Sequence, residues 1–122
     1  MPSNVQALHL LGKASISGQG NRLDNQLMGS EGDNHLSGGA GKDYLDGLYG
    51  NDVLTGGTGV DTFNFNRWQG HDVITDFGFK GELDLINIKQ FLTAGIKPVL
   101  TMTGADTLIS FSTGDSIQLL GV

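Results

Sequence analysis

A nine-residue repeat in the middle of the chain limits what this sequence can fold into. Three consecutive words, GGAGKDYLD, GLYGNDVLT and GGTGVDTFN, run from residue 38 to residue 64. Each word has Gly at the fourth place, Asp at the sixth and a bulky apolar residue at the eighth. A fixed short period over several copies is typical of a repeat architecture, in which each unit stacks on its neighbours. We therefore expect a structure built by stacking these words.

The repeat weakens on both sides of these three words. The two preceding words keep an apolar eighth residue but carry Asn25 and Asn34 at the sixth place. After residue 64 the pattern returns in RWQGHDVIT, where Asp72 follows Asp61 by eleven residues instead of nine. The repeats are therefore expected to continue in both directions, with Asn in place of Asp on one side and a two-residue slip on the other.

The length and local composition of the sequence predict one domain in three parts. A chain of 122 residues has the length of a single domain, and no Gly-, Ser- or Pro-rich linker divides it. Beyond residue 75 short alternating apolar runs, ELDLINI, TLISF and SIQLL, are typical of strands. A short helix around residues 89–94 is an option that the sequence leaves open. We expect an N-terminal strand or cap over residues 1–19, repeats over 20–75 and a C-terminal capping region over 76–122.

Composition narrows the chemistry of the chain. With 13 acidic and 7 basic side chains, the net charge of -6 disfavours nucleic acid as a partner and favours cations. No cysteine is present, which excludes disulfides and thiolate metal sites. No apolar run approaches the roughly 20 residues of a membrane span. The 20 glycines lose much backbone entropy on folding, so we expect something beyond apolar burial to stabilise the fold.

Each word reads as a tight turn followed by a very short strand. Glycines permit the positive φ angles and close backbone approach of a six-residue turn, and a single inward apolar side chain suits a strand of about three residues. Two words then make one coil with a turn at each end, and successive coils stack as parallel strands. The expected fold is all-β, a parallel β-roll with a C-terminal β capping segment.

Stacking in this way brings acidic side chains together at the two edges of the roll. Turns on one edge are eighteen residues apart, so Asp43 comes next to Asp61 on one edge and Asn34 next to Asp52 on the other. Ionised carboxylates at the strand spacing of about 4.8 Å repel each other unless a cation lies between them. Hard oxygen ligands, with no His or Cys among them, favour Ca²⁺ over Zn²⁺ or copper. The sequence therefore predicts Ca²⁺ between the turns.

The three full words resemble the haemolysin-type, or RTX, calcium-binding nonapeptide repeats, whose consensus is GGxGxDxUx. With the partial words, the resemblance covers roughly half of the chain, and the C-terminal stretches resemble the segment that follows the repeats in many family members. It implies a parallel β-roll in which each Ca²⁺ lies between turns two words apart. Its ligands are main-chain oxygens of the second and fourth places and the sixth-place side chain of one turn, with those of the first and third places and the sixth-place side chain of the other.

Carried onto this sequence, the resemblance implies four ligand sets and two or three ions. The first set is Gly39, Gly41 and Asp43 with Gly56, Thr58 and Asp61. The second is Ser30, Gly32 and Asn34 with Gly47, Tyr49 and Asp52, where the neutral Asn oxygen holds the ion less strongly. The third is Leu48, Gly50 and Asp52 with Arg67, Gln69 and Asp72. The fourth, which departs furthest from the pattern, joins Asn21, Leu23 and Asn25 to Gly38, Ala40 and Asp43.

The resemblance also implies a function. The expected role is a Ca²⁺-dependent structural module that folds outside the cell and supports folding, stability or type I secretion of a larger secreted bacterial protein. The expected partners are calcium ions and a covalent upstream domain, and the chain is expected to be a monomer.

A polysaccharide-binding accessory module, such as that of an alginate epimerase, is the alternative. Trp68, with Arg67 and Gln69, could form a small carbohydrate-stacking patch, although a partly buried capping Trp is the commoner reading of such a residue. The seven basic residues are scattered and form no dense cationic stripe in sequence, which weakens this alternative.

Catalysis has little support. His9, His35 and His71 are candidate bases, but a structural or surface role is favoured for each, and Ser116 lies in no G-x-S-x-G elbow. An EF-hand loop is absent from the sequence, and Asp43 stands where a phosphate-binding loop needs Ser or Thr. We therefore expect a non-catalytic module.

Overall fold

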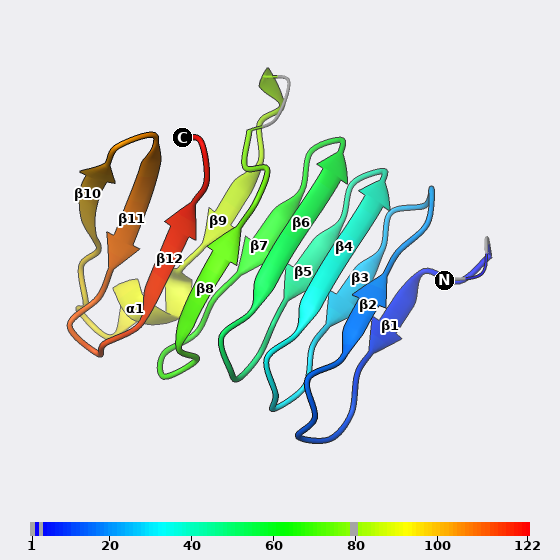
Figure 1. The fold of residues 1–122 in the computed structure, drawn as a ribbon, viewed down its shortest axis with the longest axis horizontal. Coiled ribbons are helices and arrows are strands. Elements are labelled where there is room, and N and C mark those ends of the chain that lie inside the picture. Colours follow the sequence, from blue (N-terminus) through cyan, green and yellow to red (C-terminus); the bar gives the residue numbers. More distant parts are fainter. Residues whose placement is uncertain (1, 3, 79–80) are drawn as a thin grey trace.

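The words fold into a two-layered parallel β-roll (Figure 1). The computed structural model describes residues 2, 4–78 and 81–122. One sheet has the order β1-β3-β5-β7-β9 and is parallel throughout; the roll part of the other has the order β8-β6-β4-β2 and is also parallel. The strands of the first sheet are β1 (Ala7–His9), β3 (Gln26–Met28), β5 (Tyr44–Asp46), β7 (Thr62–Asn64) and β9 (Leu85–Asn87), and those of the second are β2 (Ser17–Gln19), β4 (His35–Ala40), β6 (Val53–Thr58) and β8 (His71–Ile74).

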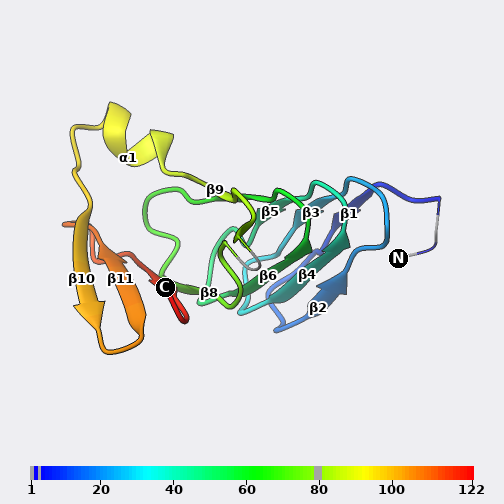
Figure 2. The ribbon, with the colours of Figure 1, turned by 90° about the horizontal axis from the view of Figure 1, so that it is seen from above.

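The alternation of the chain between two layers follows from the word length. Each word supplies one turn and one strand, so consecutive words lie in opposite sheets and every second word pairs in register. In Figure 2 the odd-numbered strands of the roll form the upper layer and the even-numbered strands the lower layer. The expectation of a parallel β-roll is confirmed, and the described part of the chain is nearly all-β, with one short helix at residues 89–93.

A single inward side chain from each strand builds a thin core between the layers. In the first sheet Leu27, Leu45 and Phe63 are in register, and each is 0% exposed. In the second sheet Leu36, Leu54 and Ile74 make the equivalent stack, and none is more than 2% exposed. These are the eighth-place residues of the words. They point inward because side chains alternate between the faces of a strand, both in the three-residue strands β3, β5 and β7 and in the longer strands β4, β6 and β8.

The two-residue slip after residue 64 is absorbed outside the sheets. Strand β8 still pairs with β6, with Val53 opposite Val73 and Leu54 opposite Ile74, at a separation of twenty residues instead of eighteen. The extra residues lie in the loop before β8, where Trp68 has φ 61°. The register of the roll therefore survives the slip.

The C-terminal region extends the second sheet past the last strand of the first. Strand β12 (Ser116–Leu119) pairs in parallel with β8, and β11 (Asp106–Ser110) and β10 (Val99–Thr103) continue the sheet antiparallel. Helix α1 (Lys89–Thr93) follows β9 at this end of the roll (Figure 2). Its one buried side chain, Phe91, stacks on Phe111 with ring centroids 3.9 Å apart. This packing extends the apolar core beyond the repeats.

No helix in the described part of the chain has the length and apolar character needed to cross a bilayer.

Candidate metal sites

The sixth-place side chains of the words form two rows, one along each edge of the roll. In the first row the main-chain N–H of Asn25 donates to Asp43 Oδ1 at 2.8 Å, that of Asp43 to Asp61 Oδ1 at 2.9 Å, and that of Asp61 to Asp84 Oδ1 at 2.9 Å. In the second row the N–H of Asn34 donates to Asp52 Oδ1 at 2.7 Å, and that of Asp52 to Asp72 Oδ1 at 2.9 Å. Each sixth-place acid is thus held by the turn before it in the stack.

Three acids of these rows each have one carboxylate oxygen that accepts no hydrogen bond from the described residues. Asp43, Asp52 and Asp61 are 2%, 1% and 0% exposed, and the Oδ2 atom of each has no hydrogen-bond partner among the described residues. A buried carboxylate oxygen without a partner is strongly unfavourable. These three atoms are therefore where a bound cation would stabilise the structure most.

Main-chain oxygens lie next to these carboxylates. A Cβ built on Gly38 would lie 2.3 Å from Asp43 Oδ2 and 2.6 Å from the carbonyl oxygen of Gly56, so both oxygens face the same small space. A Cβ on Gly57 would lie 1.9 Å from the carbonyl oxygen of Gly39. The close approach of main-chain oxygens between stacked turns explains why these positions need glycine.

The structure brings the first ligand set together. Asp43 lies against Asp61, and the carbonyl oxygen of Gly56 lies beside Asp43 Oδ2. The carbonyl oxygen of Gly41 lies 2.0 Å from a Cβ built on Gly59, and that of Thr58 accepts the N–H of Gly41 at 3.1 Å. All of these atoms lie between the same two turns.

The second ligand set meets between the turns of the other edge. A Cβ on Gly29 would lie 2.3 Å from the carbonyl oxygen of Gly47 and 2.4 Å from Asn34 Oδ1, and one on Gly50 would lie 2.6 Å from that of Gly32. Asn34 Oδ1 also accepts the N–H of Ser30 at 2.6 Å, so this oxygen already has a partner. The side chain of Tyr49 is 57% exposed, which leaves only its main chain for the turn interior.

The third ligand set keeps its two acids in register despite the slip. Asp52 and Asp72 are linked as in the other pairs, and a Cβ on Gly70 would lie 2.7 Å from the carbonyl oxygen of Gly50. Leu48 adopts φ 64°, a left-handed conformation within the turn. The Gln69 side chain is 6% exposed and its Oε1 accepts the N–H of Asn66 at 2.7 Å, so it closes the enlarged loop.

Burial makes these carboxylates resist ionisation. It raises the pKa of Asp43 to about 6, that of Asp52 and of Asp61 to about 7, and that of Asp72 to about 8. Main-chain hydrogen bonds lower each pKa in part, and nearby acids raise it again. A divalent cation between the turns would reverse this effect, because an opposite charge favours the ionised form.

The donor set fits a hard cation. Each pair of stacked turns offers two sixth-place side chains and several main-chain oxygens, and Ca²⁺ takes six to eight oxygen ligands. No three His, Cys, Asp or Glu side chains gather into a metal-binding group in the described ranges. The buried Oδ2 atoms and the carbonyl oxygens beside them are the features of this structure that match calcium.

Asp84 continues the first row, and the sequence interpretation missed it. It is 8% exposed, and its Oδ2 accepts the N–H of Gly78 at 2.8 Å. Asp84 and Ile86 repeat the spacing of acid and inward apolar residue seen in Asp43 and Leu45. The separation of 23 residues from Asp61, instead of eighteen, hid this correspondence.

Asp115 holds the enlarged loop of the second edge and was also missed. Its carboxylate accepts the N–H of Trp68 at 2.8 Å and that of Gly70 at 2.9 Å. Burial alone would raise the pKa of Asp115, but hydrogen bonds from the Thr113 hydroxyl and from these main-chain groups hold it below its ordinary value. This carboxylate is therefore fully used by protein donors.

Fifth-place side chains add a second set of links between turns. Asp24 Oδ1 accepts the N–H of Lys42 at 2.8 Å, and Asp33 Oδ1 accepts that of Asn51 at 2.8 Å. Asn51 in turn accepts the N–H of His71 at 2.9 Å. The signal was an acid or amide at the fifth place of these words, which the interpretation of the repeat left unused.

Trp68 and the three histidines, which were weighed for other functions, are exposed. Trp68 is 66% exposed, with the Arg67 guanidinium carbon 4.7 Å from its ring centroid, so the reading of a partly buried capping Trp is wrong. His71 Nδ1 lies 2.8 Å from Ser116 Oγ at an exposed position. The two residues face each other because β8 and β12 pair there, which accounts for the contact without catalysis.

A family model and one solved structure agree with this geometry. A family described as the RTX calcium-binding nonapeptide repeat, in four copies, matches residues 19–48 and 41–67. The solution structure of the R3 subunit of AlgE6, a mannuronan C5-epimerase of Azotobacter vinelandii, is similar over 90% of this chain and 73% of its own, with 25% identity and a TM-score of 0.66. The extracellular lipase LipA of Serratia marcescens aligns over 87% of this chain and 18% of its own, with 24% identity and a TM-score of 0.46. No curated protein sequence matches the chain.

The fold and the two rows of buried acids define a calcium-binding structural module built as a parallel β-roll. Residues 19–67 match the RTX calcium-binding nonapeptide repeat family.

Proposed function

We propose that this chain binds Ca²⁺ between its stacked turns and depends on these ions to close and stabilise the roll. The observation that carries the proposal is the set of buried Oδ2 atoms of Asp43, Asp52 and Asp61, which lack a hydrogen-bond partner in the described part of the chain. Without a cation, three carboxylates would be buried with one oxygen unsatisfied in each.

The proposed ions differ in their ligands. The first uses the main-chain oxygens of Gly39, Gly41, Gly56 and Thr58 with the carboxylates of Asp43 and Asp61. The next uses those of Leu48, Gly50, Arg67 and Gln69 with Asp52 and Asp72. A weaker position uses those of Ser30, Gly32, Gly47 and Tyr49 with Asn34 and Asp52, because Asn contributes no charge and its Oδ1 already accepts a hydrogen bond. The Oδ2 of Asp61 offers a further ligand towards the turn that ends at Asp84.

Ions held with modest affinity are enough to decide whether the chain folds. With a dissociation constant of about 10⁻⁴ M and about 1 mM free Ca²⁺, each site stabilises the folded state by about 1.4 kcal/mol. Three such sites contribute about 4 kcal/mol, which is comparable to the stability of a marginal domain. The calcium ions are thus proposed to have a structural role, and no step of a reaction is assigned to them.

A calcium titration of the chelated chain tests this function. Far-UV circular dichroism is expected to change from a largely disordered spectrum to a β spectrum as Ca²⁺ is added, and isothermal titration calorimetry counts the ions. Magnesium is the control, because it demands near-ideal octahedral geometry and dehydrates reluctantly. An unchanged spectrum together with no binding heat would reject the function.

We infer that such a module folds outside the cell as part of a larger secreted protein. Affinities of about 10⁻⁴–10⁻³ M are typical of extracellular calcium modules, so the chain would stay unfolded where Ca²⁺ is scarce and fold where it is plentiful. Fusion of the chain to a reporter protein in a bacterium with a type I export system tests this setting. The intact chain is expected to raise the amount of folded reporter in a calcium-containing medium. The Asp43→Asn/Asp61→Asn double variant is expected to lower that amount.

A second candidate function is binding of an extracellular polysaccharide. The exposed Trp68, with Arg67 over its ring, supports it, because exposed aromatic rings with a neighbouring cation suit anionic sugars. The fold likeness to a module of a mannuronan C5-epimerase favours the same ligand class. An NMR titration with mannuronan oligomers would show shifts centred on Trp68 that the Trp68→Ala variant loses and the Tyr49→Ala variant keeps. Absence of shifts in the calcium-loaded chain would reject this candidate.

A further inference from the structure

The two rows of sixth-place side chains both begin with Asn. Asn25 opens the first row and Asn34 opens the second, while the interior positions are Asp. A Cβ on Gly20 or on Gly29 would lie 2.4 Å from the Oδ1 atom of the Asn in its own word, just as one on Gly38 lies 2.3 Å from Asp43 Oδ2. The Asn oxygen therefore occupies the place of the unpaired Asp oxygen, and the Asn nitrogen the place of the other carboxylate oxygen.

With Asn in place of Asp, the first two stacked turns of each edge, called here the first turn pair, have a hydrogen-bond donor where the later turns have an acceptor. Asn34 Nδ2 donates to the carbonyl oxygen of Ile16 at 3.1 Å, and Asn25 Nδ2 lies 3.4 Å from that of Val5. Ile16 precedes Asn34 by eighteen residues, so it occupies the sixth place of the preceding turn and brings no acid. The amide group thus supplies a hydrogen-bond donor to an oxygen of the preceding coil.

The second place of the same two words carries a matching donor. Asn21 Nδ2 donates to the carbonyl oxygens of Pro2 and Val5 at 2.6 and 2.7 Å. Ser30 Oγ accepts from Asn34 Nδ2 at 3.1 Å, and its one proton has two acceptors within reach, the Ala14 carbonyl oxygen at 3.5 Å and Asn34 Oδ1 at 3.3 Å. The three interior words have Gly or Leu at this place, and neither side chain can donate. Among the five words from residue 20 to residue 64, donors at the second and sixth places therefore occur together only in the first two.

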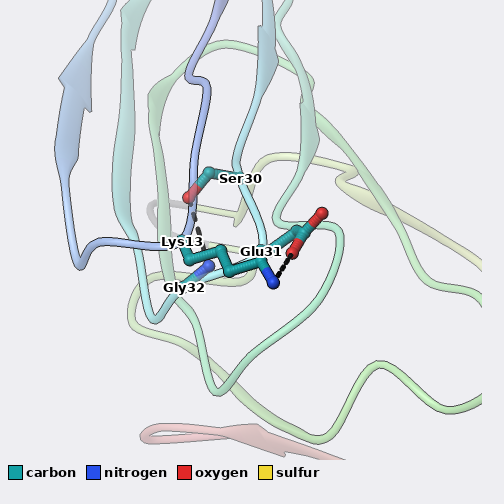
Figure 3. A network of polar contacts seen from close by, with 4 residues as sticks. All are labelled: Lys13, Ser30, Glu31 and Gly32. Carbon is teal, nitrogen blue, oxygen red and sulfur yellow. Dashed lines mark hydrogen bonds and ion pairs between the residues drawn. The ribbon is translucent and has the colours of Figure 1, made fainter.

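A salt bridge between Lys13 and Glu31 links the turn that contains Ser30 to the preceding turn. Figure 3 shows Ser30 Oγ accepting the N–H of Gly32 at 3.2 Å and Lys13 Nζ 3.8 Å from Glu31 Oε2. Lys13 belongs to the preceding turn, so its ammonium group reaches across the space between the turns. Both side chains are largely exposed, so the pair adds little stability.

We propose that Asn25 and Asn34, with Asn21 and Ser30, are the residues that limit where calcium binds, because their donors close the first turn pair of each edge with hydrogen bonds in place of an ion. A carbonyl oxygen has two lone pairs, and a cation competes with hydrogen-bond donors for them. The Ile16 carbonyl oxygen accepts from the His35 N–H at 3.3 Å and from Asn34 Nδ2, and that of Val5 faces both Asn21 Nδ2 and Asn25 Nδ2, so neither keeps a lone pair for an ion. Calcium binding therefore begins at the turns that contain Asn25 and Asn34 and extends only towards the C-terminus. This inference rests on the proposed calcium binding of the interior turns.

The first experiment leaves the chain unmodified. In excess Ca²⁺, NMR hydrogen exchange is expected to be about ten-fold slower or more for the Nδ2 protons of Asn34 than for the side-chain amide of the exposed Gln90. With a paramagnetic lanthanide in place of Ca²⁺, pseudocontact shifts should locate ions near Asp43 and Asp52 and none between Ile16 and Asn34. Rapid exchange of the Asn34 amide, or an ion located beside the Ile16 carbonyl, would overturn the inference.

The second experiment exchanges Asn and Asp at matched positions of the second row. Asn34→Asp is expected to admit an ion between the turns that contain Ile16 and Asn34, because it replaces the donor to the Ile16 carbonyl oxygen with a carboxylate. Asp52→Asn, one coil further on, is the control and should reduce the number of bound ions. Absence of a lanthanide beside Ile16 in the Asn34→Asp variant would show that the Asn34 donor is not what limits calcium binding there, and the inference would fail. Loss of all lanthanide binding in the unmodified chain would instead reject the proposed function.

Discussion

The main-chain N–H of Asp43 donates to Asp61 Oδ1 at 2.9 Å, while Asp43 Oδ2, on the same 2%-exposed side chain, is left without a partner among the described residues. Each acid of the row therefore accepts a hydrogen bond from the turn before it in the stack, and it also carries negative charge that no donor in the described part of the chain compensates. The first role orders the stack. The second makes the stack depend on a cation.

Removing one of these charges should weaken calcium binding. Asp61→Asn keeps an oxygen that can accept the N–H of Asp43 but removes the carboxylate, and we expect the apparent calcium affinity to fall about ten-fold or more, about 1.4 kcal/mol. The calcium midpoint of the circular dichroism transition measures this. Asp33→Asn is the matched control, because it also removes one charge but lies at an exposed fifth place. Equal shifts in both variants would mean that net charge, not the row, sets the affinity.

Stability should respond to pH in opposite directions with and without calcium. The raised pKa values of Asp43, Asp52, Asp61 and Asp72, about 6 to 8, mean that protonation favours the folded chain in chelator. That contribution is fully present below the unfolded pKa of about 3.9 and is lost as the pH rises through 6 to 8. In excess Ca²⁺ the thermal midpoint should instead rise over the same interval, because the ion binds ionised carboxylates. In chelator, far-UV circular dichroism measures the folded fraction, which should fall as the pH rises. A thermal midpoint that falls with pH in excess Ca²⁺ would contradict this prediction.

Alanine substitutions at Gly57 and Gly104 distinguish the cost of backbone strain from the cost of a steric clash with a neighbouring carbonyl oxygen. Gly57 and Gly104 both have positive φ, 97° and 74°, so an added Cβ strains either backbone by roughly 1–2 kcal/mol. At Gly104 nothing lies within 4 Å of the new Cβ, whereas at Gly57 it would lie 1.9 Å from the Gly39 carbonyl oxygen. Gly57→Ala should therefore lower both the stability and the calcium affinity, and Gly104→Ala the stability alone. Chemical denaturation and calcium titration measure the two effects, and similar affinities for both variants would count against a ligand role for Gly39.

The thin core should be sensitive to truncation even when calcium is bound. Leu54 is 0% exposed at the centre of its stack, and Leu54→Ala is expected to cost about 2–5 kcal/mol of unfolding free energy in excess Ca²⁺. Leu11→Ala, at a residue that is 75% exposed, should change it little. Urea denaturation gives both values. A small effect at Leu54 would mean that ions and hydrogen bonds at the edges, not the core, dominate stability.

Much of the roll could be predicted because its information is local. The spacing of Asp43, Asp52 and Asp61, with an apolar residue two places after each, is enough to define turn, strand and inward side chain, and it predicted that Asp43 lies against Asp61. The same rule failed at Asp84 because the chain between it and Asp61 is five residues longer than a coil of two words. A rule based on a fixed interval cannot detect a correspondence that a longer loop preserves in space.

The sequence by itself determined the period, and with it the two layers, the stacking of Leu27, Leu45 and Phe63, and the acidic edges, because a nine-residue word allows one turn and one short strand. Only the tertiary structure decided which oxygen of each acid is satisfied and that Asn34 Nδ2 meets the Ile16 carbonyl. It also decided that Asp115, 45 residues after Gly70, closes the enlarged loop. The direction in which a side-chain oxygen or nitrogen points depends on what the neighbouring coil presents to it, and that neighbour is set by the stack and not by adjacent residues.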